Sequence, residues 1–408
     1  MTLDPDDEAL NLLSHLHAVW RGDRTAFRRL AIIVTACLTL AGTASATDER
    51  LPWGQSSDMA AWQTFSLMVA PSRNPGQHTA EFETWASDQD VYTASPHWPA
   101  PGTPKQLQPS LAATAHGVTG VHSLVITPNE CFKPGNAAAG NFPATGCIGE
   151  EVRRNFASYQ YIVSNGLYST AGLARAFKAG LKVDLPPDAI EFKGDWVRVV
   201  DLIAWIKRTE GLTLTKPRVR ELYYVNAATS GQTTDEFALV GFHFATKQIK
   251  NWVWADFEHR LNPGRCDTIG CHDDFGATNP VVQPKATANQ NYGECQKTPA
   301  LLAMLANAGL SPVWQNYCLK GAEIDFIQAN GKPQLLGNSV VERIDANIPV
   351  GKSSCITCHA YASFDAKGNH GLLKFTDTLP VGKVDETRLK TYVGNDFIWG
   401  IANLAAAK

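Results

Sequence analysis

The sequence predicts an α+β fold: a largely antiparallel β-sheet body with helices, followed by a C-terminal segment of helix and loop. Four segments rich in β-branched and aromatic residues follow one another between residues 190 and 259. Segments with apolar residues at helical spacing, polar cap residues and closing glycines lie on both sides of them. Residues 70–147 are rich in Pro, Ser, Thr and Gly, so we expect them to be mostly loop.

The expected helices flank the strand-rich region. Residues 151–164 carry apolar side chains at helical spacing, and a second helix, capped by the Ser-Thr pair at 169–170, stops at Gly180. Beyond the strands, a helix begins at Thr298-Pro299 and ends at Gly309, because proline is favoured in the first turn and glycine just past the end. The C-terminal region is expected to contain helix and loop.

The predicted strands are residues 190–200, 221–227, 236–246 and 251–259. In the first strand, the period of two places Glu191, Lys193 and Asp195 on one face. These charges are typical of a solvated face with cross-strand pairing, and equally of a charged wall beside a binding site. In the last strand, Trp254 is expected in the core, and His259 lies on the other face.

Composition and charge exclude some classes of protein. The chain has 408 residues, 36 Lys and Arg, 39 Asp and Glu, and a net charge of −3. Because no block of basic residues occurs, nucleic acid is not an expected partner. No second long apolar stretch follows the N-terminal region, so the mature chain is expected to have no transmembrane segment. The predicted organisation is a leader and signal peptide (1–46), an α+β body (47–285) and a C-terminal segment (286–408) that can form one domain with the body.

The N-terminal region has the pattern of an export signal. Arg28-Arg29 precedes a short apolar run over residues 30–40, and Ala44-Ser45-Ala46 follows as a cleavage site. Cys37 also resembles a lipoprotein signal, but apolar residues continue after it, which favours ordinary cleavage after Ala46. Residues 1–27 make a long, acidic leader, so the true start codon stays open. The expected location is the periplasm.

Cys355-Ile356-Thr357-Cys358-His359 reads C-x-x-C-H, the attachment pattern of a c-type haem. Cys355 and Cys358 can each form a thioether to one vinyl group, and His359 is then held under the iron as the proximal ligand. A half zinc site or a thioredoxin-type redox pair uses the same cysteine spacing. Haem c is attached outside the cytoplasmic membrane, so this motif and the export signal agree. The sequence therefore predicts one covalent haem c.

The other cysteines fit disulfides. Outside the leader and the motif, six remain: Cys131, Cys147, Cys266, Cys271, Cys295 and Cys318. An even number in an exported protein predicts three disulfides, and neighbours in sequence suggest Cys131–Cys147, Cys266–Cys271 and Cys295–Cys318. The stretch from Cys266 to His272 also reads C-x4-C-H, an expanded haem motif, so a second haem site is the alternative to a small disulfide loop.

The second axial ligand of the iron cannot be a methionine downstream of the motif, because the last Met is Met304. The ligand is therefore a histidine, an upstream methionine, or absent. His259 is the first candidate, since it follows an aromatic strand that can form a dry wall against a haem and neutral imidazole binds iron well. His370, His243 and Met304 are the further candidates.

Four stretches together resemble a known group of proteins. They are Ile190-Glu191-x-Lys193-x-x-Trp196, Leu239-Val240-Gly241-x-His243, Trp252-x-Trp254-x-x-Phe257-Glu258-His259 and Ser354-Cys355-Ile356-Thr357-Cys358-His359-Ala360. The chain resembles, over roughly residues 150–400, exported bacterial monohaem proteins labelled "cytochrome c family protein". The resemblance implies haem and a periplasmic location, and names no substrate. The motif lies near the C-terminus, unlike that of small soluble cytochromes c.

The expected function is periplasmic electron transfer with a redox partner protein. The alternative is a haem-dependent oxidoreductase that acts on a small-molecule substrate, or a gas or redox sensor, with an open iron position. The chain after Ala46 is about 360 residues long. A simple electron carrier needs far fewer residues, which favours an added binding or catalytic body.

Overall fold

The computed structural model describes residues 51, 55–73, 79–108, 139–285, 287–345, 348–371 and 380–405. All of them belong to one compact unit, Asp48–Lys408. The expected leader and signal peptide, with Cys37, lie outside the described residues. Helices long and apolar enough to cross a membrane are not found in the described part of the chain.

One eight-stranded sheet forms the centre of this unit, and its strands are β1 (Ala86–Ser87), β2 (Gln106–Leu107), β3 (Ile148–Arg154), β4 (Ile190–Arg198), β5 (Val225–Ser230), β6 (Thr233–Thr246), β7 (Val253–His259) and β8 (Tyr317–Glu323). The order is β1-β3-β4-β6-β5-β2, with β7 and then β8 continuing from β6. Only the β2–β5 pair among these described strands is parallel. The helices and this sheet confirm the predicted α+β class.

The long strand β6 organises the sheet. One edge pairs with β4 from Phe237 to Thr246, whereas the other edge pairs with β5 in the first half of β6 and with β7 in its second half. The register against β4 shifts between Asp195 and Trp196, where Val240 is the extra residue. Such a bulge bends and twists a strand. The sheet therefore curls. Strands β7 and β8 extend it from the second half of β6.

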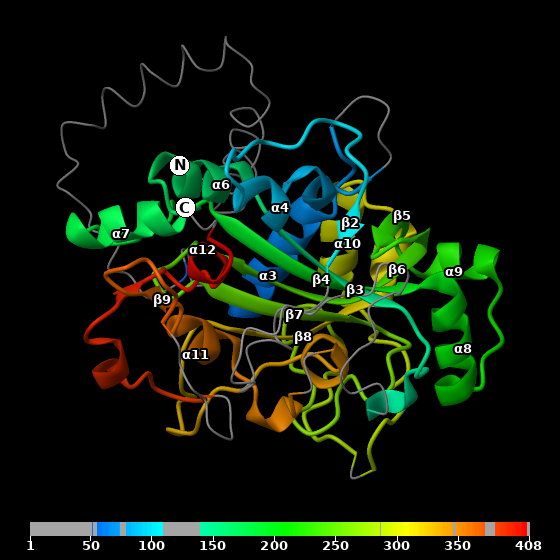
Figure 1. The fold of residues 1–408 in the computed structure, drawn as a ribbon. Coiled ribbons are helices and arrows are strands. Elements are labelled where there is room, and N and C mark those ends of the chain that lie inside the picture. Colours follow the sequence, from blue (N-terminus) through cyan, green and yellow to red (C-terminus); the bar gives the residue numbers. More distant parts are fainter. Residues whose placement is uncertain are drawn as a thin grey trace, which may run out of the picture. The chain divides into compact units, whose positions relative to one another are not determined.

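The helices are α3 (Ser57–Met68), α4 (Asp88–Val91), α6 (Phe156–Ser164), α7 (Thr170–Lys178), α8 (Val199–Glu210), α9 (Lys216–Leu222), α10 (Pro299–Asn307), α11 (Cys355–Ala360) and α12 (Gly400–Asn403). Helices α3 and α10 lie above the central strands in Figure 1, and α11 lies below them. Trp62 and Phe65 of α3 pack on Phe257 of β7 with ring centroids 4.8–4.9 Å apart. We call this side of the sheet the aromatic face.

Local signals predicted several elements well. Helix α7 is capped by Ser169, whose side chain accepts from the Gly172 amide, and Gly180 ends it at a φ of 66°. Helix α10 follows the Thr298 cap, and Gly309 closes it at the same φ. A positive φ is free of the Cβ clash only in glycine. Caps and closing glycines are local, which is why the sequence reveals them.

Elsewhere the prediction was wrong. The helix expected over residues 151–164 begins only at Phe156, where the Asn155 side chain caps it, because the preceding residues form β3 against β4. Arg154 is fully buried and pairs with Asp88 and Glu191. The strand expected to reach residue 200 ends at Arg198, and α8 follows. Tertiary pairing overrides local propensity in both places. Strand β8 was not predicted.

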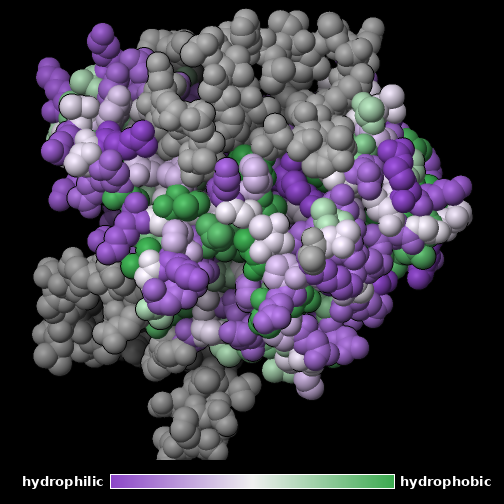
Figure 2. Space-filling model, turned by 90° about the horizontal axis from the view of Figure 1, so that it is seen from below, coloured by the Kyte–Doolittle hydropathy of each residue, from purple (hydrophilic) through white to green (hydrophobic). Residues whose placement is uncertain are grey.

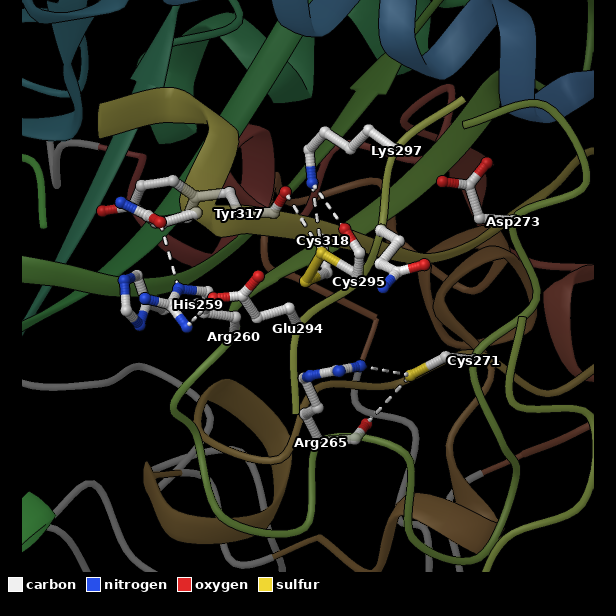
Figure 3. Close-up of a disulfide and its surroundings, with 12 residues drawn as sticks. His259, Arg260, Arg265, Cys271, Asp273, Glu294, Cys295, Lys297, Tyr317 and Cys318 are labelled. Carbon is white, nitrogen blue, oxygen red and sulfur yellow. Dashed lines mark hydrogen bonds and ion pairs between the residues drawn. A yellow bond between two sulfur atoms is a disulfide. The ribbon is translucent and has the colours of Figure 1, made fainter. Parts of the chain in front are cut away.

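Two of the three predicted disulfides are confirmed. Cys266 bonds to Cys271, and Cys295 bonds to Cys318, which joins the segment before α10 to β8. Figure 3 shows the second bridge beside Lys297, whose Nζ lies 3.1 Å from the Cys295 Sγ. Cys147 is also disulfide-bonded, and its predicted partner, Cys131, lies outside the described residues. The two bridges are typical of proteins from oxidising compartments.

The described surface is mostly hydrophilic on the lower face of the molecule, with small groups of hydrophobic residues between (Figure 2). The large apolar side chains that are exposed come from separate elements and loops: Leu67, Phe156, Val200, Leu212, Val282, Leu302 and Val381. Scattered apolar side chains of this kind are ordinary for a globular protein.

Candidate functional site

The C-x-x-C-H motif opens a short helix, α11, on the side of the sheet opposite α3. The helix comprises Cys355–Ala360, so Cys355 and Cys358 lie about one turn apart. His359 is four residues after Cys355 and therefore on the same side of the helix. Cys355 is buried, whereas Cys358 and His359 are half-buried. The two sulfurs and the imidazole are thus presented together.

The two motif cysteines are free thiols, although four other described cysteines pair with each other. Burial, with the charge of Glu342 next, raises the pKa of the Cys355 thiol well above its usual range and that of Cys358 to about 12. A thioredoxin-type redox pair needs a lowered thiol pKa. The raised pKa values of these thiols therefore disfavour a thioredoxin-type redox pair.

The imidazole of His359 is oriented by a backbone carbonyl. Its Nδ1 lies 2.8 Å from the carbonyl oxygen of Phe397. Ligating histidines characteristically donate one ring N–H in this way, which leaves the other nitrogen for the metal. Burial lowers the pKa of His359 to about 3, so the ring is neutral, as a ligand must be. The ring of Trp254, from β7, packs at 4.6 Å between centroids.

Glu323, the last residue of β8, caps the motif helix from the sheet. Its Oε1 accepts the Ile356 amide at 2.7 Å, and the same carboxyl group accepts the Cys355 amide. Ser354, in the local cap position, makes no side-chain cap hydrogen bond. A helix start leaves backbone donors unpaired, and here a carboxyl distant in sequence satisfies two of them. Glu323 therefore determines where the motif helix begins.

Helix α11 lies against the sheet face opposite the aromatic face. This face is polar, and we call it the motif face. It carries His243 of β6, which lies beside Asp256 of β7 in register. One ligand atom each of His243, Asp256 and Cys355 lie within 4.8 Å of one another. The Nδ1 atom of His243 is also 3.5 Å from Oε1 of Glu342. The motif sulfur, an imidazole and two carboxyls therefore meet at this face.

The loop before the motif brings further polar groups onto this face. The Nδ2 atom of Asn338 donates to Oδ1 of Asp256 at 2.6 Å, and the Ser339 amide donates to Glu258 at 2.7 Å. Asn338 comes so close to β6 that a Cβ on Gly241 would lie 2.8 Å from its Oδ1. Burial, reinforced by Glu342 and Glu258, raises the pKa of Asp256 well above its usual range. The raised pKa favours the protonated form of this carboxyl.

The charges predicted on the first strand are not solvated. Lys193 forms an ion pair with Glu150 at 2.6 Å, and Asp195 is fully buried on the same face. Oxygens of Glu150, Asp195 and Asp345 lie within 4.8 Å of one another, an arrangement that could hold a cation. Burial raises the pKa of Asp195 well above its usual range. The expected cross-strand pairing is present in the Lys193–Glu150 ion pair, but Asp195 is buried beside Asp345 of the C-terminal segment and is not solvated.

The structure does not bring His259, the first candidate for the second iron ligand, to the motif. Its Nε2 lies 3.1 Å from the Leu222 carbonyl oxygen, and its Nδ1 accepts the Leu261 amide at 3.2 Å. Its ring stacks on Tyr223 at 3.5 Å, near the bridge in Figure 3. His259 lies on the aromatic face, about 16 Å along β7 from Trp254 at strand spacing. The expectation for His259 is not supported, because alternation along a strand sends its side chain away from the motif.

The other candidates also have local explanations. Met304 of α10 packs against the core of the aromatic face. His370 is half-buried and bridges to Phe364 through the backbone. The Cys266–Cys271 disulfide takes both sulfurs of the expanded haem motif, and Nε2 of His272 lies 2.8 Å from the Ile269 carbonyl oxygen. The stretch from Cys266 to His272 is therefore a disulfide loop.

Sequence reasoning missed three residues of the site: Glu323, Asn338 and Glu342. Each reaches the motif through tertiary contact, so spacing could not reveal it. Glu342 lies in a π-helical turn, Val341–Asp345, a feature frequent at functional sites. The one available signal was Gly241 two residues before His243, since a glycine within a strand marks close approach by another segment.

Comparison with protein-family models, with curated proteins and with solved structures finds no match. The functional argument therefore depends on the motif and its surroundings.

Proposed function

We propose that the chain is an exported c-type cytochrome that carries one haem, bound covalently through Cys355 and Cys358, with His359 as the proximal iron ligand. The observation that carries the proposal is the state of the motif: two free thiols one helical turn apart, next to an imidazole whose Nδ1 is already held by the Phe397 carbonyl. These residues fit haem c, because the remaining Nε2 is the atom that iron needs.

The protein's own residues prepare this site. Glu323 holds the start of α11, and Thr357 Oγ1 donates to the Gly382 carbonyl at 2.8 Å, so the helix is held at two points. Trp254 supports the plane of the His359 imidazole. A bound haem c supplies a one-electron Fe(III)/Fe(II) couple. Cys358 and His359 are half-buried, which supports electron exchange at the surface near α11.

Export to the periplasm is part of the same proposal. The signal peptide expected over residues 1–46 lies outside the described residues, but the two disulfides support an oxidising compartment. Periplasmic location also agrees with the place where haem c is attached. The partner that fits a one-electron carrier is a periplasmic redox protein.

The test of attachment is extraction of the mature, haem-loaded protein with acid-acetone. We expect the haem to stay with the denatured chain, at one haem per chain. Replacing both motif cysteines with alanine should abolish retention, whereas Cys266→Ala/Cys271→Ala, the matched removal of the other closely spaced pair, should leave it intact. Complete extraction from the wild-type protein would refute the c-type assignment.

The test of electron transfer is the reactivity of the iron. A carrier should show a reversible one-electron couple in protein-film voltammetry, and its reduced form should not bind carbon monoxide quickly, because both axial positions are filled. Rapid carbon monoxide binding would favour the alternative, an oxidoreductase or a sensor with an open iron position and a small-molecule substrate or ligand.

A further inference from the structure

The motif face carries a second imidazole placed for a metal. A ring nitrogen of His243 lies within 4.8 Å of the Cys355 sulfur. Among the described histidines, at positions 97, 243, 259, 272, 359 and 370, only His243 joins a motif cysteine in this way. Strand alternation places it on the face that α11 covers.

The nitrogen atoms of His243 have different surroundings. Nδ1 lies 3.5 Å from Oε1 of Glu342, an ion-pair distance, but it is buried and has no hydrogen-bond partner among the described residues. Within the part of the chain that the structure describes, Nε2 makes no hydrogen bond. A histidine with one nitrogen facing a carboxylate and the other free has the arrangement of a metal ligand with its orienting partner. His359 differs in that its Nδ1 is already hydrogen-bonded to the Phe397 carbonyl oxygen.

Glu342 is itself held in place. Its Oε2 accepts the Asn338 amide, and it lies in a π-helical turn that follows Asn338. Its other oxygen, Oε1, lies 3.5 Å from Nδ1 of His243. The carboxyl is therefore aimed at His243. An anionic partner makes an imidazole a stronger electron donor to a metal.

We infer that His243 is the second axial ligand of the haem iron and that Glu342 is the positioning residue that holds it. This inference rests on the proposed covalent haem. It makes the protein a bis-histidine cytochrome, with one ligand from the motif and the other from near the C-terminal end of β6, and it replaces His259 as the candidate. A bis-histidine site has no open iron position, so it favours electron transfer over substrate or gas binding.

The experiment uses the mature, haem-loaded protein and the variants His243→Ala and His272→Ala. His272 is an exposed histidine outside the motif face, so it is the matched control. Optical and electron paramagnetic resonance spectra report the spin state, and acid-acetone extraction reports attachment. We expect low-spin iron in the wild type and the control, and high-spin iron that binds carbon monoxide in His243→Ala, with haem retention unchanged. Added imidazole should restore the low-spin spectrum.

A low-spin spectrum that persists in folded His243→Ala, or a wild-type protein that is already high-spin, overturns the inference while the covalent haem stands. Wild-type protein without covalent haem is the separate failure of the proposed function. If this haem-free wild-type protein contains zinc, and the His243→Ala variant does not, then His243, Asp256 and Cys355 hold a metal ion instead. Should His243→Ala not accumulate, His243→Gln keeps the volume and carries the same expectation.

Glu342→Gln tests the positioning role. The amide keeps the size and a hydrogen-bond acceptor but removes the negative charge. We expect the iron to stay low-spin and the reduction potential to rise, because a less electron-rich imidazole stabilises Fe(III) less. A purely structural Glu342 would leave the potential unchanged while lowering thermal stability, and that result would overturn its assignment.

Discussion

Replacing Glu323 separates two opposite contributions of this carboxyl to stability. It is only 2% exposed and accepts two backbone amides at the start of α11. Glu323→Ala leaves both buried donors unpaired, at a cost of about 2–4 kcal/mol in total. Glu323→Gln keeps an acceptor there and removes only the ionisable group. The two variants therefore distinguish the cap from the charge.

The charge contribution follows from the pKa. Burial raises the pKa of Glu323 from 4.5 to about 8. A carboxyl whose folded pKa lies above its unfolded value stabilises the protein fully below pH 4.5, and this stability is lost as the pH rises towards 8. At pH 7 the loss is about 3 kcal/mol, from 1.36 kcal/mol for each pH unit above the unfolded pKa. The Glu323→Gln variant does not lose this stability, because its side chain does not ionise.

The assay is urea denaturation of the haem-loaded protein, followed by far-ultraviolet circular dichroism at pH 5 and pH 8. Glu323→Gln should match the wild type within about 1 kcal/mol at pH 5 and exceed it by about 4 kcal/mol at pH 8. Glu323→Ala should be less stable than the wild type at pH 5, and its free energy of unfolding should approach that of the wild type at pH 8. If the free energies of unfolding of the wild type and Glu323→Gln differ by the same amount at both pH values, the reasoning about ionisation is refuted.

Two further predictions concern the disulfides and His259. Replacing Cys295 and Cys318 with serine should lower the free energy of unfolding by about 3 kcal/mol. The same change at Cys266 and Cys271 should lower it by about 2 kcal/mol, because the loop that this bridge closes is shorter. Denaturant titration measures both values, and a larger loss for the Cys266–Cys271 pair would contradict the loop argument. His259→Ala should destabilise by about 3 kcal/mol, since the Leu222 carbonyl and the Leu261 amide lose a buried partner. Its haem spectrum should match that of the wild type, and a change in spin state would restore His259 as a ligand candidate.

The sequence by itself predicted the features that depend on neighbouring residues. The caps and closing glycines of α7 and α10 are local, because a side chain satisfies amides two or three residues away. The disulfides Cys266–Cys271 and Cys295–Cys318 join near neighbours in the chain. The C-x-x-C-H motif likewise needs only five consecutive residues, so the predicted haem site required no knowledge of the fold.

Tertiary structure decided which distant side chains meet that motif. Glu323 caps a helix that begins 32 residues later, and His243 reaches Cys355 from 112 residues upstream. The sequence marks His243 and His259 equally, since both follow aromatic, β-branched stretches. Only the register of β6 against β7 shows that one faces α11 and the other the aromatic core. Strand alternation is local, but which face another segment covers depends on long-range packing.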